Sequence, residues 1–328
     1  MSAEGGTLVV GATGFLGSAL MRELVAAGGA PRGTHRDRRG REAIDGMGGT
    51  PVAADLLDPA GLRRAMEGCA LVYHLGGMNT LCPRDPGRLF EVNVRGSANV
   101  IEAAAAAGVR RVVYTSSAAT IGERRGVVAS EDTEHRGWFL SAYERSKYLA
   151  ERRVVELGRE LGVEVVCLNP SSVQGPGRTG GTARFLIRYA QGRLRWLVRT
   201  RVSLLAVDDC VAAHRRAAEL GRPGQRYLLS SFTLPIEELL ELAGQVTGVR
   251  HRLRFIPPRL ALGGAVAVGR LAAAAGRRPP VCGEMVRTLL HGHAYDGRRA
   301  ATELDLTYTS PEDLLRETFA WYSSQGLI

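Results

Sequence analysis

Residues 7–17 read Thr7-Leu8-Val9-Val10-Gly11-Ala12-Thr13-Gly14-Phe15-Leu16-Gly17. The apolar run before Gly11 is typical of a buried parallel strand, and residues 18–27 continue with helical spacing. Glycines at this junction allow a tight turn and let the backbone approach a pyrophosphate at the helix N-terminus. The glycine triplet alone is a weak signal, but its place between a strand and a helix predicts a dinucleotide-binding unit.

Short apolar strands alternate with helices over the first 170 residues or so. After the first strand we expect a weak strand ending near Thr34 or His35, and then strands at residues 52–56, 71–77, 110–117 and 163–168. A helix is expected at residues 90–107, and another from the Tyr143 region to about residue 159. Six alternations of this kind predict an α/β fold with a doubly wound parallel sheet, the Rossmann arrangement.

The remaining residues are rich in helical patterns, with one strand expected near residues 226–229 and a final helix at 311–325. We therefore expect a Rossmann domain at residues 1–170 and a smaller α+β substrate-binding lobe at 171–328, partly interleaved with it. A length of 328 residues is ample for this division.

Composition narrows the class of protein. Residues 1–6 are short and polar, so no secretory signal is expected, and Arg270 and several glycines interrupt the longest apolar stretch, residues 260–276. Five scattered cysteines without C-x-x-C spacing are interpreted as reduced thiols of a cytoplasmic protein. Because the apolar stretch at residues 260–276 is interrupted, a membrane is not an expected partner. The net charge of +10 comes from dispersed arginines that are not interleaved with aromatics, so nucleic acid is not an expected partner either.

One tyrosine–lysine pair is a candidate for catalysis. Of the 43 lysine and arginine residues only Lys147 is a lysine, and Tyr143 lies one helical turn before it. A nearby cation lowers the pKa of a phenol, and the compact ammonium is a point charge that a planar guanidinium does not reproduce. The alternative is that one lysine persists by chance, because Tyr-x-x-x-Lys alone is a weak pattern.

The segment after the second strand bears on cofactor choice. An acid about 20 residues after the glycines marks NAD-binding folds, whereas this position holds His35 or Arg36, with more arginines beyond. Arginine suits the 2′-phosphate of NADP. The adjacent Asp37 keeps NAD possible, and a solvated arginine run is the alternative interpretation. We expect NADP.

Several motifs together resemble the extended short-chain dehydrogenase/reductases, in the NAD(P)-dependent epimerase/dehydratase group. The similarity lies in GATGFLG at residues 11–17, NVRGS at 93–97, TSSAATIG at 115–122, YERSK at 143–147, NPSSVQGPG at 169–177 and VDDCVAAH at 207–214. The dihydroflavonol reductase-like and hopanoid-associated epimerase-like branch is the most similar, with 3β-hydroxysteroid dehydrogenases as cousins.

The resemblance implies roles for individual residues. Tyr143 would be the general acid/base, Lys147 would bind the nicotinamide ribose and lower the tyrosine pKa, and Ser117 would hold the substrate carbonyl. Asn93 would occupy a proton-relay or helix-shaping position. No metal is expected. The expected cofactor-binding residues are Gly11, Thr13, Gly14, Phe15, Leu16, Gly17, Arg36, Asp55, Leu56, Leu75, Gly76, Gly77, Ser116, Tyr143, Lys147, Pro170 and Val173.

Departures from the family patterns narrow the reaction. Sugar-nucleotide 4,6-dehydratases carry an acidic pair where this chain has Ala118 and Ala119, and Val202 stands where many sugar-nucleotide enzymes have an arginine for the diphosphate. We therefore expect a carbonyl reductase or alcohol dehydrogenase. An epimerase of a sugar or sugar nucleotide is the alternative, and a non-catalytic cofactor sensor is a third possibility.

The substrate is expected to be a small molecule. An apolar or aromatic ketone or alcohol is indicated by Met78, Trp138, Phe139, Phe185, Trp196 and Leu197, although each is more often plain packing. The resemblance also implies a homodimer formed through the helices at residues 90–107 and 143–159.

Overall fold

Seven parallel strands form the central sheet of the computed structural model, which describes residues 5–250, 253–277, 279 and 281–328. The predicted doubly wound α/β fold is confirmed, because the chain starts at the middle of the sheet and extends it first to one side and then to the other. In spatial order the strands are β11 (Arg226–Leu229), β7 (Glu164–Pro170), β5 (Arg111–Thr115), β4 (Cys69–His74), β1 (Gly6–Val10), β2 (Arg32–His35) and β3 (Thr50–Ala53).

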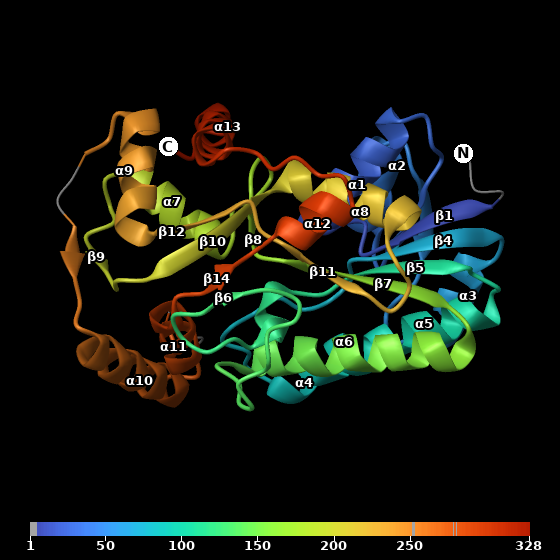
Figure 1. Cartoon of the computed structure of the whole chain (residues 1–328), viewed down its shortest axis with the longest axis horizontal. Helices are drawn as coiled ribbons and strands as arrows, with labels where there is room; N and C mark the ends of the chain where they lie inside the picture. Colours follow the sequence, from blue (N-terminus) through green and yellow to red (C-terminus); the bar gives the residue numbers. More distant parts are fainter. Residues whose placement is uncertain (1–4, 251–252, 278, 280) are drawn as a thin grey trace.

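Helices cover both faces of this sheet (Figure 1). One apolar core joins the sheet to α3 (Pro59–Met66), α5 (Gly96–Ala106) and α6 (Ala142–Leu161). The other joins it to α1 (Phe15–Ala26), α2 (Arg38–Gly46), α8 (Val207–Leu220) and α12 (Arg298–Glu303). With both faces covered, strands β1, β4, β5 and β7 are mostly apolar, which explains why they read as apolar runs in the sequence.

The helix predicted at residues 90–107 has an interruption. It begins as α4 (Pro86–Phe90), continues through a π-helical turn, η1 (Glu91–Arg95), and ends as α5. π-Helical turns place one extra residue in a helix and are frequent at functional sites. Asn93 lies in this turn and is buried.

The C-terminal lobe has its own apolar core, formed by α7 (Thr182–Ala190), α9 (Ile236–Thr247) and α13 (Pro311–Ser324). Its sheet consists of β8 (Ser172–Gln174), β10 (Arg201–Ala206) and β12 (Phe232–Pro235). The strand expected near residues 226–229 is β11, which lies in the central sheet. Chain after residue 170 therefore contributes to both parts of the molecule.

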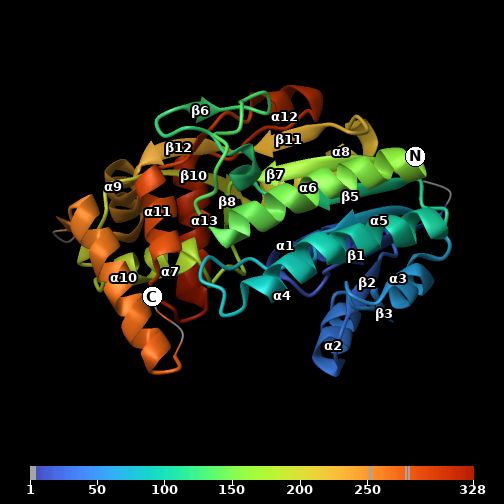
Figure 2. The same ribbon diagram turned by 90° about the horizontal axis from the view of Figure 1, so that it is seen from below.

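Two helices project at the end of the lobe, α10 (Pro258–Ala274) and α11 (Gly283–His291) (Figures 1 and 2). Nearby, β9 (Trp196–Leu197) pairs with β13 (Arg254–Phe255), and β14 (Ala294–Tyr295) pairs with β6 (Val128–Ala129). In the described part of the chain, no helix combines the length and the apolar character needed to cross a bilayer.

The prediction of five reduced cysteines is wrong for two of them. Cys82, in the loop after β4, forms a disulfide with Cys282 at the start of α11. Packing of the lobe against that loop brings the two together across 200 residues, which spacing in the sequence does not reveal. Cys69, Cys167 and Cys210 are free and buried. The cysteines therefore no longer support the cytoplasmic assignment.

Candidate active site

The glycine loop between β1 and α1 is too tightly packed for side chains at its key positions. Gly11 has a φ of 86° and donates from its N–H to the Thr34 hydroxyl at 3.0 Å. A Cβ on Gly11 would lie 2.7 Å from the Gly76 nitrogen, and one on Gly17 would lie 2.1 Å from the Gly11 carbonyl oxygen. The loop therefore keeps bare backbone at the switch point of the sheet, as a dinucleotide pyrophosphate requires.

Arg36 is the charged side chain at the end of β2. The adjacent Asp37 caps α2 by accepting a hydrogen bond from Gly40 N–H at 2.8 Å. Arg36 is exposed and lies 4.0 Å from the Asp55 carboxylate across the strand ends. This corner of the sheet can hold a negative group beside Arg36.

The other residues expected at the cofactor lie in the glycine loop or at the carboxyl ends of strands. Leu56 packs beside Gly76, since a Cβ on that glycine would lie 3.2 Å from the leucine side chain. Pro170 ends β7, and Val173 is buried in β8. The same edge carries Thr13, Phe15, Leu16, Leu75, Gly77 and Ser116. Their contacts with a cofactor stay predictions.

Ser117 and Tyr143 lie together at the start of two helical segments. Ser117 caps the 3-10 turn η2 (Ala118–Ile121), and Tyr143 is in the first turn of α6, which Ser141 caps. Desolvation raises the pKa of Tyr143 above its ordinary value, whereas a hydrogen bond with Ser117 and the charge of Arg178 oppose that rise. A phenol and a hydroxyl are thus held in mutual contact at the carboxyl edge of the sheet.

Lys147 is buried one turn along α6. Its Nζ donates to the Tyr114 hydroxyl and to the Thr115 carbonyl oxygen, each at 2.9 Å. Burial lowers the pKa of Lys147 to about 8, although the nearby Glu151 carboxylate acts in the opposite direction. The influences that lower the pKa of Tyr143 in this structure come from Ser117 and Arg178. The expected effect of Lys147 on the pKa of Tyr143 stays a prediction.

Arg178 is a site residue that the sequence analysis missed. It follows the glycine-rich end of the 169–177 motif, and its guanidinium lies 5.2 Å from the centre of the Phe15 ring. Its Nε is buried without a hydrogen-bond partner. Arg178 therefore places a positive charge between the glycine loop and Tyr143. In an arginine-rich chain its sequence position gave no sign of this role.

Asn93 ties the π-helical turn to its neighbours. Its side-chain amide donates to the Met78 carbonyl and to the Ser146 hydroxyl, and its oxygen accepts from Met78 N–H at 2.7 Å. These contacts fix the chain after β4 against the helix that carries Tyr143 and Lys147. The geometry corresponds to the helix-shaping role expected for Asn93.

A second group of residues that the sequence analysis missed joins Glu123, in the loop after η2, to two histidines of the C-terminal lobe. The buried Glu123 carboxylate is 2.6 Å from His293 Nδ1 and 3.5 Å from His291 Nε2. Burial raises the pKa of Glu123, but its contacts with His291 and His293 outweigh that effect and lower the pKa to about 2. The ligand atoms of these three residues lie within 4.8 Å of one another, so they could hold a divalent cation.

The expected apolar substrate contacts receive little support. Trp138 and Trp196 are each 54% exposed, and Phe185 and Leu197 pack against the core of the C-terminal lobe. His74 is a buried core histidine bonded to the Ser97 hydroxyl at 3.0 Å, and desolvation lowers its pKa to about 3. None of these side chains forms a substrate pocket by itself.

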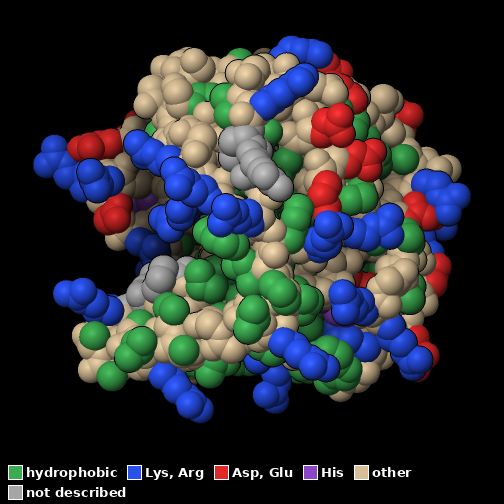
Figure 3. Space-filling model, turned by 90° about the vertical axis from the view of Figure 1, so that its left-hand side faces the viewer, with side chains coloured by type: hydrophobic (Ala, Val, Ile, Leu, Met, Phe, Trp, Pro, Cys, Tyr) green, Lys and Arg blue, Asp and Glu red, His purple; other side chains and the backbone are tan. Residues whose placement is uncertain are grey.

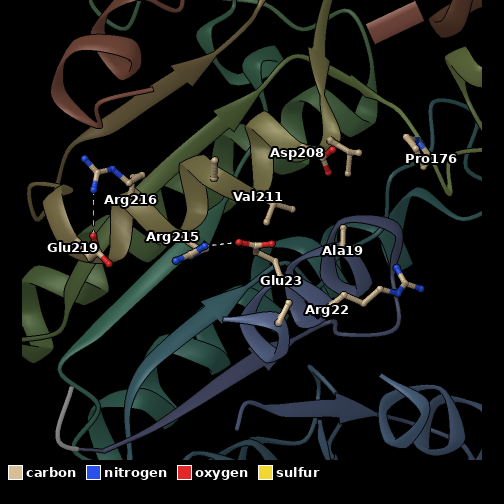
Figure 4. A pocket seen from close by; sticks show the side chains of 12 residues that line it. Ala19, Arg22, Glu23, Pro176, Asp208, Val211, Arg215, Arg216 and Glu219 are labelled. Atoms are coloured by element: carbon tan, nitrogen blue, oxygen red, sulfur yellow. Dashed lines mark hydrogen bonds and ion pairs between the residues drawn. The ribbon is translucent and has the colours of Figure 1, made fainter. Parts of the chain in front are cut away.

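A groove of about 600 Å³ lies elsewhere, between α1 and α8 (Figure 4). An ion pair between Glu23 and Arg215 crosses it. Its lining contains neither Ser117 nor Tyr143 nor Lys147. The candidate active site therefore lies at the carboxyl edge of the sheet and not in this groove.

The site combines a glycine loop at the switch point of a seven-stranded parallel sheet with a serine, a tyrosine and a lysine. This combination defines an NAD(P)-dependent enzyme of the extended short-chain dehydrogenase/reductase class. The model of the NAD dependent epimerase/dehydratase family matches residues 7–230. This chain belongs to that family, as its motifs predicted.

Known relatives agree with this assignment. The chain is 32% identical to sterol demethylase protein B of Methylococcus capsulatus, with 98% of this chain and 99% of that protein covered. It is 28% identical to a putative dihydroflavonol 4-reductase of Synechocystis sp., with 98% and 95% covered. The solved structure of gox2253 is similar with a TM-score of 0.86 and 30% identity, covering 98% and 99%. A UDP-glucose 4-epimerase of Thermotoga maritima, at 20% identity and a TM-score of 0.79, shares the fold.

Proposed function

We propose that this protein is an NADP(H)-dependent carbonyl reductase or alcohol dehydrogenase. The observation that carries the proposal is the contact between Ser117 and Tyr143 beside the buried ammonium of Lys147. The glycine loop, in which a Cβ on Gly11 or Gly17 would clash with backbone, fits a dinucleotide. The exposed Arg36 at the end of β2 supports NADP, whereas Asp37 already caps α2.

The residues of the chain divide the work of the reaction. The bound nicotinamide supplies or accepts the hydride. Tyr143 donates its phenolic proton to the carbonyl oxygen during reduction and takes it back during oxidation, a contribution of about 10²–10⁴-fold. Ser117 holds that oxygen as negative charge develops on it. Lys147 supplies a positive charge for the nicotinamide ribose, and Arg178 favours the phenolate of Tyr143.

An apolar ketone or alcohol is the proposed substrate. Relatives at 28–32% identity are named sterol demethylase protein B, putative dihydroflavonol 4-reductase and cinnamoyl-CoA reductase 1. Val202 stands at the position where many sugar-nucleotide enzymes have an arginine for the diphosphate, and it packs, partly buried, against the core of the C-terminal lobe. That placement argues against a sugar nucleotide.

An epimerase is the second candidate, and the family description supports it. An epimerase oxidises and re-reduces one substrate, so it consumes no net cofactor and often retains bound NAD. Absorbance in the nicotinamide band of the purified protein, before any cofactor is added, separates the two candidates.

The test of the reductase proposal is Tyr143→Phe. Turnover of NADPH with a panel of apolar ketones should fall about 10²–10⁴-fold, because the proton donor is lost. Binding of NADPH, measured by fluorescence titration, should be unchanged. Tyr148→Phe on the same helix is the matched control, since among the described residues the Tyr148 hydroxyl is hydrogen-bonded only to Arg152. Full turnover by Tyr143→Phe would reject the assignment.

We also propose a homodimer through the outer surfaces of α5 and α6, which lie side by side (Figure 2). Leu149 of α6 is 38% exposed and would be covered there. Light scattering coupled to size exclusion tests it. The cytoplasmic assignment remains a proposal that fractionation would check.

A further inference from the structure

α10 presents an apolar stripe to solvent. Leu260 and Leu271 are 67% and 71% exposed, and Val268 between them is 39% exposed. Residues at intervals of about 3.6 share one face of a helix, and this stripe continues along one face through Gly264, Ala267 and Ala274. On the other side Ala265 is buried. In the described part of the chain, nothing covers the leucines.

The segment of the chain that contains this stripe carries charges of one sign. Residues 242–283 contain no aspartate or glutamate, but they contain seven arginines. Arg259, Arg270 and Arg277 are exposed on or just after α10. Figure 3 shows apolar side chains gathered along the lower part of this end of the molecule, with Lys and Arg side chains projecting around them.

We propose that α10 docks this protein on an anionic phospholipid surface. The leucine stripe would lie in the boundary between headgroups and acyl chains, and the arginines would reach the lipid phosphates. With 17 residues and glycines in its middle, α10 suits a position in the plane of the membrane. A second copy of this chain fits the surface poorly, because like charges would meet.

This proposal revises the expectation of no membrane partner. That expectation rested on Arg270 and the glycines, which interrupt a spanning segment. In a helix that lies on the membrane surface, Arg270 would favour binding, because its long side chain can reach the headgroups while the helix stays at the interface.

The docking helix is joined to the active site through α11. At the start of α11, Cys282 is bonded to Cys82, and Glu284 accepts a hydrogen bond from Ala142 N–H at 3.2 Å. Arg287 donates to the Leu140 carbonyl at 3.4 Å. Tyr143 directly follows Ala142. Docking would therefore bring the reductase site near the bilayer, and, if the proposed function holds, its substrate is a ketone or alcohol that resides in membranes.

The experiment is flotation with vesicles, and it uses the full chain. Vesicles of phosphatidylcholine alone are compared with vesicles that also contain phosphatidylglycerol, at low and high salt. The test variant is Leu260→Gln with Leu271→Gln. The matched control is Leu161→Gln with Leu220→Gln, two leucines that are 45% and 44% exposed on other helices.

Wild type and control should float with the anionic vesicles, less so at high salt, and the test variant should partition at least about tenfold more weakly. No binding of wild type to anionic vesicles, or equal binding by the test variant, would overturn the proposal. A wild-type dimer that becomes monomeric only in the test variant would also overturn it, because a second copy would then cover α10.

Flotation needs no turnover, so its result is independent of the proposed function. Reduction of a water-soluble ketone without vesicles should be the same for the test variant and wild type. Loss of that activity in Tyr143→Phe alone would support the reductase while leaving the vesicle result to decide on docking.

Discussion

The Nζ of Lys147 lies 2.9 Å from the hydroxyl oxygen of Tyr114 and 4.6 Å from the centre of its ring. Its second partner, the Thr115 carbonyl, is also neutral. Both oxygens belong to the end of β5, directly before Ser116 and Ser117. The only lysine of the chain is thus a buried cation bonded to the strand that leads to Ser117, the proposed catalytic serine.

Replacing Lys147 by methionine should change how stability depends on pH. Burial lowers the lysine pKa from about 10.5 to about 8, so between these values the unfolded chain binds the extra proton. The wild type should therefore gain about 1–2 kcal/mol relative to Lys147→Met as pH rises from about 7.5 to 9.5. Urea unfolding of both proteins across this range measures the difference, and parallel curves would contradict it.

Arg178→Met should affect oxidation more than reduction. The Arg178 charge favours the phenolate of Tyr143, so its removal raises the tyrosine pKa further. Alcohol oxidation needs the phenolate as base and should require a higher pH, whereas reduction at neutral pH uses the protonated phenol. The pH–rate profile of oxidation measures this shift. Arg184→Met, an exposed arginine nearby on α7, should leave the profile in place.

Arg36→Ala should change the choice of cofactor. A guanidinium–phosphate contact is a hydrogen bond between charged groups, so its loss should weaken NADPH binding about tenfold or more while NADH binding changes little. Titration of both cofactors against the variant measures the ratio. Arg38→Ala is the control, because Arg38 pairs with Glu42 on the outer side of α2. Equal losses for both cofactors would indicate that Arg36 does not meet a 2′-phosphate.

The sequence predicted those parts of the site whose geometry depends on residues that are close together in the chain. The glycine turn follows β1 directly, and Tyr143 and Lys147 share one helical turn, so neighbouring residues determine their geometry. Ser117 could be placed because parallel strands end at one edge of the sheet.

The contacts that the sequence missed join residues far apart in the chain. Glu123 meets His293 across 170 residues, and Cys82 meets Cys282 across 200. Both contacts depend on how the C-terminal lobe packs against loops of the first domain. No periodicity encodes that packing. The π-helical turn at Asn93 was missed for a related reason, since Asn93 makes its contacts with Met78 and Ser146, which lie 15 and 53 residues away in the chain.

Removing the Cys82–Cys282 disulfide should lower stability by about 2–4 kcal/mol, because the bond closes a long loop of the unfolded chain. Denatured protein treated with an alkylating agent should show three reactive cysteines before reduction and five after it. The Cys82→Ser, Cys282→Ser double variant is the control and should lose all sensitivity to reductant. Five reactive cysteines before reduction would show that the bond does not form.

Glu123→Gln should destabilise the protein at neutral pH and lose its effect in acid. The wild-type carboxylate has a pKa of about 2, below its ordinary value of 4.5, because contacts with His291 and His293 outweigh its burial. Between these values the unfolded chain binds the extra proton, so the stability that the carboxylate provides is complete above about pH 4.5. This stability is lost as pH falls toward 2. The shift corresponds to about 3 kcal/mol at pH 7.

Chemical denaturation of wild type and Glu123→Gln across this acid range gives the measurement. The two curves of unfolding free energy should be farthest apart above pH 4.5 and converge below it. Glu134→Gln changes an exposed glutamate that follows β6 and should follow the wild type throughout. A gap that persists unchanged in acid would mean that Glu123 acts through packing alone. Convergence of the two curves would show that the charge of Glu123, which lies between two histidines of the C-terminal lobe, holds the loop after Ser117 against that lobe.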